Sequence, residues 1–403
     1  MSGKMSNDWN YSLSIALLLM APFDLIASLA MDVYLPVIPK MPAALNTTPS
    51  VIQLTLSLYM VTLGLGQLFF GPLSDRTGRR KVVLTGALIF TISSFVLAIT
   101  TNGYLFLAAR VFQALGSSAA LVATFATVRD VYADKPEGNA IYSLFSSMLA
   151  FVPALGPILG AILAYQFGWR MIFIFLGTIG LLAFVHALIR WRETKPSSVK
   201  KENISVSLVF KSLSFWIYTL GFSTAMGSFF VFFSTAPRVL MEKVGLTQMH
   251  FSFVFASVAI VMILVSRFAK TFVIKWGTKG CLIRGLLIIL TGSMILTVCN
   301  YLMELSITSF VLPMWVIAVG MIFIVSVTAN GALEEFPHMA GTAVAFYYCI
   351  QSMLVSVVGT AVTLLLPGDS AWPLIVFTLL LPMCTFKVMG LEFLIRKFRL
   401  KHP

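Results

Sequence analysis

The chain is organised as a series of apolar runs of about 20 residues, the length that crosses the hydrocarbon core of a bilayer as a helix, separated by short charged segments. Apolar residues make up 59% of the 403 residues and charged residues only 11%, whereas soluble domains carry about 25% charged residues. A soluble fold of this composition would expose large apolar patches. The sequence therefore predicts an integral membrane protein and excludes a cytosolic enzyme, a disulfide-rich secreted domain and a disordered chain.

We interpret the apolar runs as membrane-spanning helices of an all-α membrane protein. The first run carries two acids and two prolines and is not followed by a cleavage-site pattern, so we interpret it as a helix rather than a signal peptide. The twelve predicted spans are residues 12–36, 51–72, 82–100, 104–128, 139–163, 171–190, 213–236, 250–266, 282–300, 308–329, 340–365 and 371–395.

Lys and Arg accumulate in alternate connecting segments, which predicts that both termini are cytoplasmic. The net charge of +13 then faces anionic lipid, and we assign it no nucleic-acid partner. The longest polar stretch, Arg190 to Lys211, divides the chain near its midpoint. We predict two six-helix bundles, 1–190 and 213–403, joined by a linker at 191–212, which is the layout of transporters built from repeats.

The segment 71–81, GPLSDRTGRRK, predicts a tight turn between two spans. Glycines permit unusual dihedrals and close backbone approach, and an acid can cap a helix or pair with Arg at the membrane surface. The alternative is a purely electrostatic anchor. A weaker counterpart occurs at 267–280. The predicted cytoplasmic gate comprises Gly71, Asp75, Arg76, Gly78, Arg79 and Arg80.

Two acids lie inside the first span, Asp24 near its middle and Asp32 toward its outer end. A carboxylate in hydrocarbon costs several kcal/mol or is neutralised by taking up a proton, which is the property that a proton-coupling group needs. The alternatives are a structural hydrogen bond for Asp24 and a partly solvated position for Asp32.

Arg110 is an arginine well inside a span. It keeps its proton and needs a carboxylate, carbonyls or water as partners. We expect Asp32 to be such a partner, with the alternative that Arg110 forms a static ion pair.

The segment 153–160 combines Pro153 and Pro157 with Gly156 and Gly160. These residues predict a bent helix with a smooth face that packs closely on a neighbour and seals one side of a transporter. Ordinary small-residue packing is the alternative.

Three of these segments together resemble the major facilitator superfamily. They are the loop 71–81, the segment Arg110-Val-Phe-Gln-Ala-Leu-Gly116, which is similar to the family's RxxQG motif except at Ala114, and the segment 153–160, which is similar to the GPxxG motif of its drug:proton antiporter branch. The resemblance implies twelve helices in two pseudo-symmetric bundles. It also implies export driven by the proton gradient.

Longer segments resemble the Cml/FloR group of phenicol exporters, among them 17–42, 122–133, 146–157, 227–239 and 326–333. This resemblance implies proton-coupled efflux of chloramphenicol and florfenicol across the bacterial inner membrane, conferring resistance. A broad multidrug antiporter and an uptake symporter remain alternatives. Since phenicols are neutral aromatics, we expect an apolar pocket with a few polar groups. The candidates are Tyr59, Met148, Phe229, Phe232, Phe233, Tyr347 and Gln351.

Other chemistries lack support in the sequence. It contains no GxxxxGK[ST] segment, no nucleophile–base pattern and no His or Cys pair at metal-ligand spacing. We therefore expect a monomeric transporter rather than an enzyme, with no metal or organic cofactor and with drug, protons and lipid as its partners.

Overall fold

The computed structural model describes residues 9, 11–132, 136–195, 207–336 and 340–401, which form helices and connecting turns without a strand. The middle of the predicted linker, 196–206, lies outside the described residues. The chain divides into two compact units, Met1–Glu202 and Asn203–Pro403, and the boundary between them falls inside the segment 191–212.

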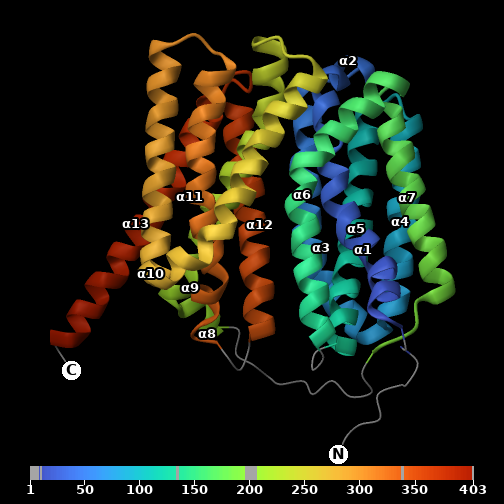
Figure 1. Ribbon diagram of the computed structural model, residues 1–403, viewed down its shortest axis with the longest axis horizontal. Coiled ribbons are helices and arrows are strands. Elements are labelled where there is room, and N and C mark those ends of the chain that lie inside the picture. Colours follow the sequence, from blue (N-terminus) through green and yellow to red (C-terminus); the bar gives the residue numbers. More distant parts are fainter. Residues whose placement is uncertain (1–8, 10, 133–135, 196–206, 337–339, 402–403) are drawn as a thin grey trace, which may run out of the picture. The chain divides into compact units, whose positions relative to one another are not determined.

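Unit 1 is built from long helices that run side by side, drawn from blue to green in Figure 1. Helix α5 lies against α3 and α4, and α1 lies against α5, α6 and α7. The elements are α1 (Leu13–Asp32), η1 (Leu35–Lys40), α2 (Met41–Ala44), α3 (Pro49–Thr77), α4 (Arg79–Ile99), α5 (Gly103–Tyr132), α6 (Pro136–Phe167) and α7 (Arg170–Arg190).

Unit 2 is centred on α9, which packs against α11, α12 and α13 and buries most of its side chains. No residue of α9 carries a charge, so the helix can be surrounded on all sides by other helices. The elements are α8 (Ser207–Lys211), α9 (Leu213–Pro237), η2 (Arg238–Lys243), α10 (Gln248–Leu302), α11 (Ile307–Leu333), α12 (Ala340–Leu365) and α13 (Trp372–Lys401).

Ten helices among the described residues are long and apolar enough to cross a membrane, and α6 adds a shorter apolar segment, Phe151–Phe167. Every predicted span overlaps one of the long helices. The prediction of an all-helical chain with many candidate spans is therefore confirmed.

The turn predicted at 71–81 is confined to a single glycine. Helix α3 continues to Thr77, and only Gly78, with φ of 105°, separates it from α4. In unit 2, α10 runs through the segment 267–280 and is broken only at Gly277, with φ of 68°. The tight turn predicted at 71–81 is therefore confirmed, and each helix continues past its apolar run until a glycine adopts positive φ.

The same backbone features recur in both units. The side chains of Thr48 and Thr247 cap α3 and α10, and the same number of residues separates each cap from the positive-φ glycine. Gly86 of α4 meets Gly116 of α5, and Gly285 of α10 meets Gly320 of α11. In each pair the glycine carbonyls lie where a Cβ of the partner would stand, because two helices approach backbone to backbone.

We predict that Gly320→Val destabilises the protein by about 1–3 kcal/mol or more, the usual cost of overpacking a helix interface. A Cβ at this position would lie 2.6 Å from the carbonyl oxygen of Gly285, which belongs to the rigid helix backbone. The measurement is the thermal unfolding midpoint in detergent. Gly71→Ala is the control, since a Cβ there would meet no atom within 4 Å. Equal midpoints for the two variants would contradict the assigned packing.

Candidate functional site

Asp24 lies in the interior of unit 1. Its side chain is 1% exposed, and among the described residues neither carboxylate oxygen has a hydrogen-bond partner. The preceding residue, Phe23, packs edge-to-face on Trp191, with 5.7 Å between the ring centroids. Because an ionised carboxylate without a partner is unfavourable in an apolar interior, this environment favours the protonated form of Asp24 until another group or water reaches it.

Arg110 of α5 is completely buried and holds a polar network between three helices. Its Nη1 donates to the Ala30 carbonyl of α1 at 3.1 Å and to Gln113 Oε1 at 2.7 Å. Gln113 Nε2 in turn donates to Ser94 Oγ of α4 at 2.9 Å. The guanidinium nitrogens Nε and Nη2 have no hydrogen-bond partner among the described residues. Arg110 therefore keeps donors available in the interior of unit 1.

Two tyrosine rings shield the charge of Arg110. Its guanidinium carbon lies 4.4 Å from the ring centroid of Tyr59 and 5.1 Å from that of Tyr34, within the range of cation–π attraction. The Tyr59 hydroxyl donates to the Ala27 carbonyl at 2.8 Å and lies 3.0 Å from Ser117 Oγ. Tyr59 of α3 is thus fixed beside Arg110, and its hydroxyl bonds to α1 at Ala27, about one helical turn from Asp24.

Asp32 ends α1 and is 5% exposed. The described ion pairs do not include one between Asp32 and Arg110, which uses the Ala30 carbonyl and Gln113 instead. The Cβ of Asp32 lies 2.6 Å from where a Cβ of Gly156 would stand, and Gly160 lies against the Val33 backbone. The glycines of α6 therefore let the end of α1 approach closely. Pro153 and Pro157 lie within the same helix.

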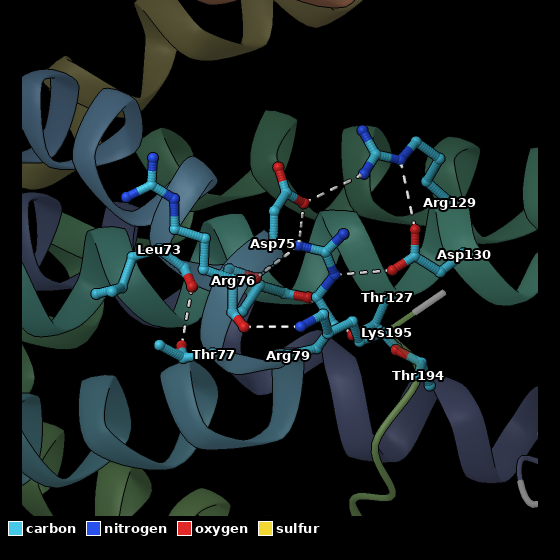
Figure 2. A network of polar contacts seen from close by, with 12 residues as sticks. Leu73, Asp75, Arg76, Thr77, Arg79, Thr127, Arg129, Asp130, Thr194 and Lys195 are labelled. Carbon is cyan, nitrogen blue, oxygen red and sulfur yellow. Dashed lines mark hydrogen bonds and ion pairs between the residues drawn. The ribbon is translucent and has the colours of Figure 1, made fainter. Parts of the chain in front are cut away.

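The segment 71–80 forms a polar cluster around Arg79 (Figure 2). The Arg79 guanidinium is 1% exposed and contacts Asp75 at 2.5 Å and Asp130 of α5 at 2.7 Å. It also donates to Ser74 Oγ at 2.8 Å. Arg79 thereby ties the start of α4 to the ends of α3 and α5. By contrast, the Arg76 side chain is exposed and points away from this cluster.

Glu193, which follows α7, caps the first turn of α4. Its carboxylate accepts from the backbone N–H of Arg79 at 2.7 Å and of Arg80 at 3.3 Å, where the helix dipole favours a negative charge. A Cβ at Gly78 would overlap this carboxylate. Lys195 adds a bond from Nζ to the Arg76 carbonyl at 2.7 Å, shown in Figure 2. The segment 193–195 therefore closes over the turn between α3 and α4.

The predicted pocket residues differ in their burial. Phe232 stacks between Phe255 and Phe310, at centroid distances of 5.3 and 5.7 Å, and is a core residue of unit 2. Phe233 is also buried, whereas Phe229 is half-buried. Met148 in α6 is half-buried as well.

Tyr347 and Gln351 lie on one face of α12. Tyr347 donates to Thr328 Oγ1 at 2.9 Å and stacks on Phe222 with 4.9 Å between the centroids. Gln351 is 5% exposed. These two residues place polar groups in the interior of unit 2.

The sequence marked one further member of these clusters and missed two. Gln113 stands in the segment that resembled RxxQG, and this signal already marked it. Asp130 follows Arg129 at the end of a span, and Glu193 lies in a polar segment. For these two acids no spacing indicates the partner, because each contacts a helix that is distant in the sequence.

Residues 23–360 match the model of the Major Facilitator Superfamily. A protein of Pseudomonas aeruginosa named chloramphenicol resistance protein is 48% identical over 93% of this chain and 89% of its own length. The transporter YdgK of Bacillus subtilis, described as uncharacterised and of MFS type, is 31% identical over 85% of this chain and 87% of its own. Multidrug resistance protein MdtL of Salmonella typhi is 28% identical over 63% of both chains.

Solved structures share the fold. A D-xylose–proton symporter superimposes with a TM-score of 0.74 at 16% identity, covering 93% of this chain and 97% of its own. A bacterial homologue of the human lysosomal transporter Spinster, in an inward-facing and occupied conformation, gives 0.74 at 14% identity over 94% and 97%. At these identities the likeness shows the fold alone.

We predict that Arg79→Ala lowers the free energy of unfolding by about 3 kcal/mol, because it removes the buried guanidinium and leaves the buried carboxylate of Asp130 only the exposed Arg129, whose Nε lies 3.6 Å away. The measurement is the thermal unfolding midpoint in detergent. Arg76→Ala removes the same charge from an exposed side chain and is the matched control. A midpoint for Arg79→Ala within error of that control would contradict the role of Arg79 in joining the three helices.

Proposed function

Because the chain belongs to the major facilitator superfamily, we propose that it exports phenicol antibiotics such as chloramphenicol and florfenicol in exchange for protons. The identity of 48% to a chloramphenicol resistance protein over 93% of the chain supports the substrate class. The lower identity and coverage of the multidrug relative make a broad multidrug antiporter the second candidate.

The single observation that carries the coupling mechanism is the unpartnered, buried carboxyl of Asp24. A protonated carboxyl is neutral and tolerates this apolar environment, whereas the ionised form needs a donor or water. A drug that presents a donor to Asp24 stabilises the ionised form and releases the proton. Drug and proton therefore compete for one group, which is the condition for exchange.

Arg110 supports this exchange because its hydrogen bonds hold a charged donor in the interior of unit 1. Its guanidinium stays charged and is held by the Ala30 carbonyl and Gln113. The free Nε and Nη2 groups supply donors to the ionised carboxyl or to a polar group of the drug. Asp32 lies where α1 meets Gly156 of α6. As these two helices move against each other, Asp32 adjusts the competition between drug and proton.

We further propose twelve spans arranged as two pseudo-symmetric bundles, with residues 1–190 and 213–403 joined at 191–212. Helix α10 contributes two spans because Gly277 breaks it, and α6 contributes one. The recurrence of the caps and of the paired glycines supports an internal repeat. In the rocking cycle the cluster around Arg79, with Asp75, Gly78 and Arg80, belongs to the cytoplasmic gate.

The location follows from the distribution of charge. Lys and Arg concentrate in alternate connections, which supports a topology with both termini in the cytoplasm, and the bacterial relatives support a location in the inner membrane. The proton gradient supplies the driving force, so we propose no metal or organic cofactor. We propose that the monomer is the transporting unit.

We predict that Asp24→Asn abolishes proton-driven export of chloramphenicol but keeps drug binding, because the amide resembles the protonated carboxyl and cannot release a proton. In vesicles energised with a pH gradient, the initial rate should fall at least about tenfold, a barrier change of about 1.4 kcal/mol. Glu304→Gln, which makes the same change at an exposed position, should leave the rate unaltered.

Full proton-dependent export by the Asp24→Asn variant would reject this role of Asp24. Adding a protonophore should abolish export by the wild-type protein. Export of ethidium at a rate comparable to that of chloramphenicol would favour the multidrug alternative, because a narrow phenicol exporter does not accept the cationic dye.

A further inference from the structure

The described part of unit 2 contains three buried hydroxyl groups without a hydrogen-bond partner, those of Ser234, Ser356 and Thr360. All three belong to α9 and α12, which pack against each other. The other unit 2 side-chain atom that is buried without a hydrogen bond, Arg238 Nε, lies 3.7 Å from Glu242 in an ion pair. The unpartnered neutral groups of unit 2 are therefore confined to one pair of helices.

Neighbouring hydroxyls of α9 are satisfied. Thr219, Ser223, Ser228 and Thr235 each donate to the carbonyl four residues earlier, at 2.7–2.8 Å. This bond is the ordinary way for a helical Ser or Thr to satisfy its hydroxyl in an apolar environment. Ser234 stands in the same helix and does not make it. The helix offers Ser234 a backbone carbonyl four residues earlier, as it does for the other four residues. The orientation of the Ser234 side chain therefore leaves its hydroxyl free.

A glycine contact places Ser234 on the face of α9 that meets α12. A Cβ at Gly359 of α12 would lie 2.8 Å from a ring carbon of Phe230 of α9, and Phe230 lies one turn before Ser234. Ser356 is one turn before Gly359 and shares its face of α12. Thr360 follows Ser356 by one turn. The three hydroxyls thus line the seam between α9 and α12.

This seam suits a neutral ligand. Neither α9 nor α12 carries a charged residue, so these two helices offer no carboxylate to a cation. A hydroxyl both donates and accepts hydrogen bonds, and it therefore complements alcohol, amide and carbonyl groups. Leaving such groups buried and unpaired is unfavourable, and apolar side chains of the same size would pack without this cost. Their presence points to a molecule that supplies the missing bonds.

We propose that Ser234, Ser356 and Thr360 bind the alcohol and amide groups of the transported molecule. This inference rests on the proposed function and extends it, since it assigns drug recognition to uncharged groups of unit 2. Binding at the seam requires α9 and α12 to separate locally.

The test is the KM for chloramphenicol export in proteoliposomes with an imposed proton gradient. Ser234→Ala, Ser356→Ala and Thr360→Val each remove one free hydroxyl. Ser228→Ala and Thr235→Val are matched controls, because the hydroxyls they remove are bonded to their own helix. Thr360→Ser and Ser356→Thr keep the hydroxyl and control for changes in side-chain volume. Elution as a single species on gel filtration shows which variants are folded.

We expect the three hydroxyl-removing variants to raise KM by about tenfold each, which corresponds to about 1.4 kcal/mol of lost binding. The maximal rate should stay within about twofold of the wild-type value, because the lost hydrogen bond contributes equally to the bound state and to the transition state of transport. The controls and the hydroxyl-retaining variants should keep the wild-type KM. The inference is overturned if folded variants that lack the hydroxyl match the controls, or if Thr360→Ser shows the same KM as Thr360→Val. Absence of chloramphenicol export by the wild-type protein would overturn the proposed function as well.

Discussion

The structure depends on satisfying polar groups inside helices that are surrounded by hydrocarbon, where water does not compete for hydrogen bonds. Most buried hydroxyls achieve this by bonding to their own helix, as Ser228 and Thr235 do. Arg110 achieves it through Ala30, Gln113 and two aromatic rings. The buried groups that lack partners are informative by comparison, because burying a polar group without a hydrogen bond costs free energy that an apolar side chain does not.

Both units contain such groups among the described residues. In unit 1 they include the carboxyl of Asp24 and two nitrogens of Arg110, which can exchange a proton or respond to a charge, beside neutral groups such as Gln53 Nε2 and Trp191 Nε1. In unit 2 the hydroxyls of α9 and α12 lack partners, and neither helix carries a charge. A transporter that exchanges a neutral drug for a proton needs both kinds of group. Our proposals assign proton coupling to Asp24 of unit 1 and drug recognition to the hydroxyls of unit 2.

Much of the fold was predictable because the thickness of the bilayer sets the length of the apolar runs. Each predicted span accordingly overlaps a long helix. Helix ends were less predictable, since Thr77 and Trp276 extend their helices beyond the apolar runs to the positive-φ residues Gly78 and Gly277. For the site, the sequence identified Asp24 and Arg110 as ionisable groups in apolar spans. It did not identify Glu193, whose role as a cap depends on the packing of the segment after α7 against the start of α4.

The sequence by itself determined that the chain is helical and membrane-spanning, where its ionisable groups interrupt the spans, and which glycines can bring helices together. These properties are local, because they depend on the composition of a run or on a residue type. Only the tertiary structure decided that Arg110 bonds to Gln113 rather than Asp32, that Phe232 is a core residue, and that Ser234 lacks the bond that Ser228 makes. Partners of this kind are set by contacts between helices distant in sequence, for which a single chain carries no local signal.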